Sequence, residues 1–165
     1  MDAPTKPQKQ FVKLGFTKEE TKEVVDSLNI LLANLSVFYQ KLRNFHWNVR
    51  GGDFFDLHEK FEELYGFTAT GIDQVAERIR IFGHTPLSSL HDYLETAQVE
   101  EAGTDLSSDE MVHQVIEDFE VIESFLIDVF DIASEVGDVG TTDMLNKIIA
   151  RYEKEHWMLS AFSSK

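Results

Sequence analysis

Apolar residues recur along most of the chain at the three- and four-residue spacing of amphipathic helices. From about residue 17 to residue 50 this spacing predicts one long helix, and a second runs from Phe54 to Phe82. A third stretch opens at Ser107 and a fourth follows Gly140, while strand-like alternation is not evident anywhere. The pattern therefore predicts four long helices, each with one apolar face turned toward a common core.

Two capping boxes mark the beginnings of helices. Thr17 and Glu20 fit this motif at the start of the first helix, and Ser107 and Glu110 fit it at the start of the third. In this motif the hydroxyl accepts a hydrogen bond from a backbone amide three residues on, and the glutamate reaches back. The glycine-rich break at residues 50–53 should end the first helix and let the second return antiparallel.

The connection between the second and third long helices is about 25 residues long, which predicts a crossover in place of a hairpin. After Gly83, the pair Thr85-Pro86 places a capping residue before a first-turn proline and predicts a short helix over Leu87 to Leu94. The last helix is expected to begin at Thr141 or Thr142. The predicted fold is all-α: a ferritin-like four-helix bundle with a short extra helix in the crossover.

Composition favours one folded domain. Residues 1–16 carry two of the three prolines and are expected to form a mobile tail, and residues 17–165 the single domain. No apolar signal core or membrane-spanning run is evident, so the cytoplasm is the expected compartment.

The chain has no cysteine, which excludes zinc-thiolate sites, iron-sulfur clusters and thiol nucleophiles. Any metal ion must therefore be bound by histidine, aspartate or glutamate.

Four polar residues bordering the apolar faces could bind such an ion: His46, His58, Asp73 and Glu77. The first histidine lies five residues before Gly51 and the second lies six after Gly52, so an antiparallel hairpin would bring them to a similar height. The two carboxylates are four residues apart and project from one helical face. Two imidazoles and two carboxylates suit iron, manganese or zinc. Ordinary surface or core polar groups are the alternative interpretation.

Distance along the second helix limits how these residues could act together. His58 and Asp73 are fifteen residues apart, or about 22 Å at the rise of an α-helix, so no single ion bridges them within one chain. Fifteen helical steps nevertheless leave both groups on broadly the same side. If two subunits pair antiparallel about a two-fold axis, the histidines of one approach the carboxylates of the other. A metal site would then lie between subunits.

Two Glu-x-x-His tetrads offer a different metal site within one subunit, of the kind found in di-iron carboxylate bundles. They are Glu110-Met-Val-His113 and Glu153-Lys-Glu-His156. Glu110 already fits a capping role, and His113 falls on the polar face of its helix. His156 falls on the apolar side of the last helix, which favours a core or interface histidine. The intra-subunit site is therefore the lesser alternative.

The motifs His46-Trp47-Asn48, Leu57-His58-Glu59 and Asp73-x-x-x-Glu77-Arg78 follow one another with ligand steps of 12, 15 and 4 residues. This set resembles the Dps family, the ferritin-like mini-ferritins that protect DNA in starved cells. The resemblance extends over about residues 25–162. It implies a hollow homododecamer that oxidises Fe(II), with hydrogen peroxide preferred over dioxygen, and stores ferric mineral inside.

The resemblance also implies roles for individual residues. His46 and His58 of one subunit, with Asp73 and Glu77 of its two-fold mate, would bind two iron ions per intersubunit site. Paired iron ions would give two electrons to one peroxide, so that no hydroxyl radical is released. Trp47 is a candidate sacrificial electron donor, and an interfacial aromatic anchor is the equal alternative.

Acidic residues suggest a route for iron and a surface for mineral. Family shells have acidic three-fold pores near the turn before the last helix, where the candidates here are Glu135, Asp138 and Asp143. The candidates for mineral nucleation on the cavity side are Glu59, Glu62 and Glu63. Solvated helix ends and solvated surface charge are the alternatives for the two sets.

The charge of the chain argues against direct DNA binding. Thirty acidic and fifteen basic residues give a formal charge of −15, and twelve subunits would total about −180, which repels phosphate. Lys6, Lys9 and Lys13 give the tail some positive charge, which is the only feature that favours DNA binding.

The leading interpretation is a ferroxidase that detoxifies iron and peroxide together. The alternatives are a nucleoid-associated structural protein with secondary iron chemistry, and a catalytically poor shell acting as a recognition scaffold.

Overall fold

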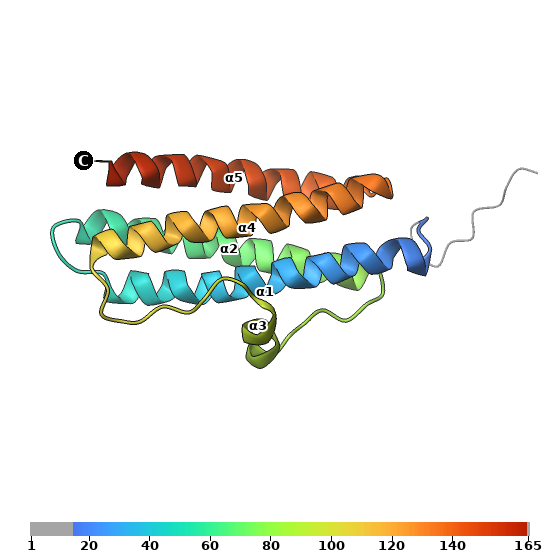
Figure 1. Cartoon of the computed structure of the whole chain (residues 1–165), viewed down its shortest axis with the longest axis horizontal. Coiled ribbons are helices and arrows are strands. Elements are labelled where there is room, and N and C mark those ends of the chain that lie inside the picture. Colours follow the sequence, from blue (N-terminus) through green and yellow to red (C-terminus); the bar gives the residue numbers. More distant parts are fainter. Residues whose placement is uncertain (1–14, 165) are drawn as a thin grey trace, which may run out of the picture.

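The structure, a computed structural model, describes residues 15–164 and folds them into five helices. The pair α1 (Lys18–Asn48) and α2 (Phe54–Ile81) packs beside the pair α4 (Ser108–Glu135) and α5 (Val139–Ser163), while α3 (Leu90–Thr96) lies outside the bundle (Figure 1). This part of the chain contains no strand, and the predicted all-α bundle is confirmed. Residues 1–14 of the predicted tail lie outside the described residues.

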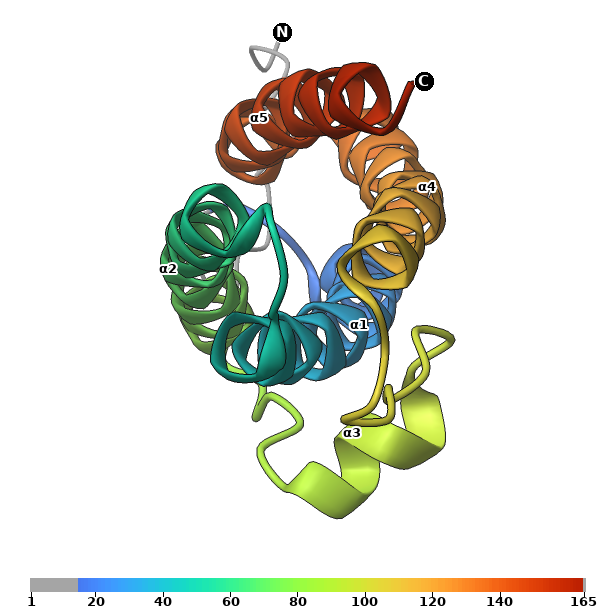
Figure 2. The same ribbon diagram turned by 90° about the vertical axis from the view of Figure 1, so that its left-hand side faces the viewer.

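Viewed end-on, the four long helices surround a common core (Figure 2). Phe38 of α1, Phe119 of α4 and Tyr152 of α5 meet there, with ring centroids 4.9 to 6.1 Å apart and no exposed surface. The Tyr152 hydroxyl shares a 2.9 Å hydrogen bond with Thr68 of α2, so its polar end is paired. No described helix has the length and apolar character needed to cross a membrane.

The helix ends show the predicted capping boxes at two places and a glycine stop at a third. The Thr17 hydroxyl accepts from the Glu20 amide at 3.2 Å, and the Glu20 carboxylate accepts from the Thr17 amide at 2.7 Å. Ser107 and Glu110 repeat this box at the start of α4. Gly83, with a φ of 85°, ends α2 in the left-handed region that glycine adopts without strain.

The start of α5 corrects the sequence-based prediction. Asp138, and neither Thr141 nor Thr142, is the N-cap, because its carboxylate accepts from the Thr141 amide at 3.1 Å. Gly140 therefore lies inside the first turn of the helix. A Cβ at Gly140 would lie only 2.8 Å from the Arg78 guanidinium, which explains why the side chain is absent there.

Asparagine side chains of α1 hold the crossover against the bundle. Asn34 is fully buried, and its Oδ1 accepts from the backbone amides of Gln98 and Val99, both at 2.9 Å. Asn29 and Asn44 bind crossover backbone on either side of this point. The crossover is thus fixed by three polar tethers along one helix.

The short helix in the crossover begins later than predicted. The spacing predicted Leu87 to Leu94, whereas α3 starts at Leu90. The Leu87 amide donates to Asn29 Oδ1 at 2.9 Å, which holds this segment in a non-helical conformation. Ser89 then caps the helix by accepting from the Asp92 amide at 3.1 Å.

We expect Asn34→Ala to lower the free energy of unfolding by about 2 kcal/mol, because it leaves the buried Val99 amide without an acceptor. Urea denaturation followed by circular dichroism measures this. Asn146→Ala, on the exposed face of α5, is the matched control and should change little. Equal losses in the two variants would show that the crossover does not depend on Asn34.

A buried ion pair links α1 to α4. Lys41 Nζ lies 2.7 Å from Asp118 Oδ2, and the two side chains are only 5% and 10% exposed. Burial raises the pKa of Asp118 to about 6, although Lys41 opposes the shift. The desolvation of two charges therefore offsets much of their attraction.

Candidate metal centre

His46 and His58 face each other across the turn between α1 and α2. Their rings stack with centroids 3.8 Å apart and an angle of 18° between the planes. Nδ1 of each ring lies 2.8 Å from the backbone carbonyl oxygen of the other residue. Because a carbonyl oxygen only accepts, each Nδ1 donates. The hairpin therefore brings the two histidines together and locks them by reciprocal hydrogen bonds.

These hydrogen bonds decide which ring nitrogen can bind a cation. With the proton on Nδ1, the neutral imidazole keeps its lone pair on Nε2. A carbonyl behind the ring commonly orients metal-binding histidines in this way. Phe54 stacks on His58 with centroids 5.0 Å apart, and Tyr65 meets His46 edge-on at 5.3 Å. Both rings are thus fixed before any cation arrives.

Asp73 and Glu77 lie on the C-terminal half of α2, far along the helix from the histidines. Both are exposed, and the ion pairs formed among the described residues include neither. The fifteen residues from His58 to Asp73 correspond to about 22 Å. No group of three or more His, Asp or Glu side chains within the described chain could hold a metal ion. The chain thus places the two histidines and the two carboxylates at separate positions. That they meet between two subunits stays a prediction.

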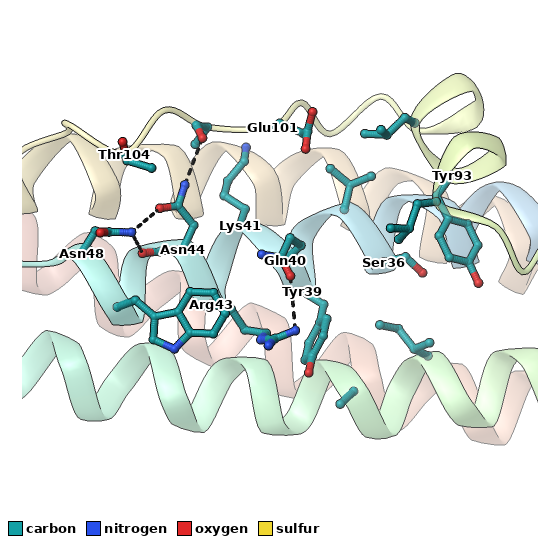
Figure 3. A pocket seen from close by; sticks show the side chains of 17 residues that line it. Ser36, Tyr39, Gln40, Lys41, Arg43, Asn44, Asn48, Tyr93, Glu101 and Thr104 are labelled. Carbon is teal, nitrogen blue, oxygen red and sulfur yellow. Dashed lines mark hydrogen bonds between the residues drawn. The ribbon is translucent and has the colours of Figure 1, made fainter.

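Trp47 borders a groove of about 780 Å³ that lies along α1, against α3 and the crossover (Figure 3). The indole is 58% exposed, and the Arg43 guanidinium lies 4.7 Å from its ring centroid. The same guanidinium lies 5.3 Å from the Tyr39 ring. Figure 3 shows Arg43 and Tyr39 extending from α1 toward α2, while Asn44 reaches the crossover on the opposite side.

The three candidate pore acids have different surroundings. Asp138 is only 1% exposed, and its carboxylate is engaged by Arg78 and Thr141. Glu135 and Asp143 are exposed, and Asp143 pairs with Lys147 at 2.8 Å. The spacing of Asp138 and Thr141, typical of a helix cap, was the sequence signal that could have revealed the structural role of Asp138.

The three candidate nucleation acids also divide. Glu59 and Glu62 are exposed on α2. Glu63 accepts from Lys60 at 2.7 Å and from Arg151 of α5, and the hydrogen bond from Lys60 leads in holding the pKa of Glu63 below its ordinary value. Lys60 and Arg151 also pair with the buried Glu155, so Glu63 belongs to a cluster in which two carboxylates share two cations.

The Glu-x-x-His tetrads take part in other contacts. Glu110 completes its capping box, and the exposed His113 donates to the Asp109 carbonyl at 2.7 Å. His156 is half-buried rather than in the core, with Nε2 3.2 Å from a carboxylate oxygen of Glu120 on α4. Sequence reasoning missed this contact because it links residues on two different helices.

Comparisons with known proteins agree with the fold. The ferritin-like domain profile matches residues 25–165. The chain is 46% identical to general stress protein 20U of Bacillus subtilis, covering 86% of this chain and 98% of that protein. It is 43% identical to DNA protection during starvation protein 2 of Bacillus anthracis, covering 86% and 97%. The crystal structure of a Dps protein from Vibrio cholerae, described as a ferritin-like diiron-carboxylate protein, superposes with a TM-score of 0.89 at 33% identity, covering 95% and 100%.

Proposed function

Because the chain belongs to the Dps family of ferritin-like proteins, we propose that it is a ferroxidase that oxidises Fe(II) and stores the ferric product. The observation that carries this proposal is the locked pair of His46 and His58, whose Nε2 atoms are left to bind a cation. Imidazole nitrogens with carboxylate oxygens suit iron, and the carboxylates stabilise its rising charge on oxidation.

In the proposed site, His46 and His58 of one subunit face Asp73 and Glu77 of the partner subunit. Two observations support this division. Both carboxylates are exposed, and Asp73 lies fifteen residues from His58, or about 22 Å along the helix. A two-fold axis generates two equivalent sites, each binding two iron ions, and further contacts about three-fold axes would complete a hollow homododecamer.

Hydrogen peroxide is the proposed preferred oxidant, with dioxygen as the alternative. One peroxide accepts two electrons from two Fe(II) ions and two protons, and yields two water molecules. Because both electrons leave together, no hydroxyl radical is released. Removal of iron and peroxide would protect DNA without contact, which fits the name of the Bacillus anthracis relative. We place this activity in the cytoplasm.

The exposed acids complete the proposed iron path. Glu135 and Asp143 would attract Fe(II) at a pore, and Glu59 and Glu62 would nucleate mineral. Direct DNA binding is not part of the proposal, because a formal charge of −15 per chain repels phosphate.

A co-assembly experiment tests whether the site is shared. A His46→Gln/His58→Gln variant is co-expressed with an Asp73→Asn/Glu77→Gln variant, each with a different affinity tag, and doubly tagged shells are purified. Half of the two-fold pairs in a random equal mixture are mixed, and one of two sites in each is complete. About a quarter of the wild-type fast iron oxidation should therefore return, although each variant alone is inactive.

The outcome separates the alternatives. A site built within one subunit would give no recovery, because every chain in the mixture lacks part of the ligand set. Recovery followed by ferric absorbance after peroxide addition would support both the ferroxidase activity and its intersubunit location. Absence of fast oxidation in wild-type shells would contradict the activity itself.

A further inference from the structure

A smaller groove lies where the N-terminal half of α1 packs beside the C-terminal half of α4. Its volume is about 330 Å³, and apolar side chains and two carboxylates line it, among them Ser27 and Ile30 of α1 and Phe125, Asp128, Asp131 and Ile132 of α4. Ile30 remains 37% exposed there. This surface, the α1–α4 groove, therefore combines exposed apolar area with negative charge.

The two carboxylates of the α1–α4 groove have no cation beside them. Asp128 and Asp131 are exposed, and the ion pairs formed among the described residues include neither. Lys22, the lysine that precedes Ser27 on α1, already pairs with Asp26 at 2.6 Å. A segment that fits the groove must therefore bring both apolar side chains and positive charge.

The first 14 residues, which lie outside the described part of the chain, have this composition. Their charged side chains are three lysines and one aspartate, and apolar residues are interleaved with the lysines at the end that joins α1, in the order Lys9, Phe11, Val12, Lys13 and Leu14. The rest of the protein is acidic, so few other segments of this chain offer the same complement.

The position and length of this segment allow it to reach the groove. Figure 1 shows that α1 begins at the end of the bundle where α4 ends. Ser27 lies nine residues into α1, or about 14 Å from Lys18, and about five extended residues span that distance. Gly15, with a φ of 92°, adopts the left-handed region in which the chain can reverse without strain. Because the segment is covalently attached, its local concentration at the groove is in about the millimolar range.

We propose that residues 6–14 bind in the α1–α4 groove of their own subunit. Phe11 and Val12 cover the exposed apolar side chains, and Lys9 and Lys13 lie beside Asp128 and Asp131. The lysines are then neutralised by the protein surface and are not available to the phosphates of a nucleic acid. This inference does not depend on the proposed ferroxidase activity.

Disulfide cross-linking in the assembled full-length protein tests this docking, because the chain has no cysteine of its own. The variant Gln10→Cys/Ser27→Cys places one thiol in the segment and one in the groove. Gln10→Cys/Asn146→Cys is the matched control, since Asn146 is exposed on α5 at a similar depth from the same end of the bundle (Figure 1). Both variants are oxidised with glutathione disulfide, and peptide mass spectrometry identifies the bonds that form.

We expect a disulfide within one chain to form several times faster in the groove variant than in the control. Adding Asp128→Asn/Asp131→Asn should slow this reaction about fivefold, as for the loss of two exposed ion pairs. Adding Glu100→Gln/Asp105→Asn, which removes two exposed acids of the crossover, should not slow it. Equal rates in the groove variant and the control, a disulfide that joins two chains, or equal effects of the two acid substitutions would overturn the inference.

Discussion

The variant His46→Gln/His58→Gln is expected to lose the rapid phase of iron oxidation. Changing groups that merely orient metal ligands commonly costs roughly 10- to 100-fold, so removing two ligands should cost about 100-fold or more. Stopped-flow absorbance of the ferric product, after anaerobic Fe(II) loading and addition of stoichiometric peroxide, measures the rate. Spin trapping in the same mixture should detect more hydroxyl radical, because iron then reacts singly in solution.

Two further variants keep this result interpretable. His91→Gln/His113→Gln removes two exposed histidines and should oxidise iron at the wild-type rate. Because the first variant also removes the reciprocal hydrogen bonds of the hairpin, Asp73→Asn/Glu77→Gln tests the same site from its exposed half. Wild-type rates in both ligand variants, with intact shells, would refute the assignment.

Lys41→Met is expected to lower the free energy of unfolding by about 3 to 5 kcal/mol, because it leaves the buried carboxylate of Asp118 without its cation. Urea denaturation at pH 7 measures the loss. Lys147→Met removes an exposed pair of similar length, 2.8 Å, and should cost less than about 1 kcal/mol. Similar losses in the two variants would show that burial of the Lys41–Asp118 pair does not increase its effect on the free energy of unfolding.

The same pair predicts a dependence of stability on pH. The pKa of Asp118 is raised from 3.8 to about 6, so between these values the folded state binds more protons than the unfolded state. Its contribution to stability therefore falls as pH rises from about 4 to about 6. The double variant Lys41→Met/Asp118→Leu should lack this slope and be as stable as wild type or more so.

The sequence predicted what depends on local pattern. Helical periodicity identified the four long helices, and two capping boxes marked the starts of α1 and α4. The meeting of His46 and His58 also followed from the pattern, because a short turn between antiparallel helices leaves little freedom in their relative height. These features need only neighbours in sequence or one hairpin.

Features that depend on distant partners were not predicted. Asp138 was interpreted as a candidate pore residue because its acidity is visible in sequence, whereas its burial against Arg78, sixty residues away, is not. The late start of α3 depends in the same way on Asn29. Glu63 was interpreted as a candidate nucleation residue, and its contact with Arg151 was not predicted because Arg151 lies on another helix. The role of the candidate ligands stays a prediction, since it requires a second subunit.

In the proposed site, the distance between the histidines at the α1–α2 turn and the carboxylates farther along α2 would link cation binding to assembly. In a shared site, neither the two histidines nor the two carboxylates alone hold the ion well, so the ion binds chiefly to associated subunits. By mass action, free iron then stabilises the contact between subunits in proportion to RT ln(1 + [L]/Kd), and chelation weakens it. Under the proposed assembly, iron binding and subunit association would thereby be thermodynamically linked, and the contacts between subunits would be strongest while iron is bound.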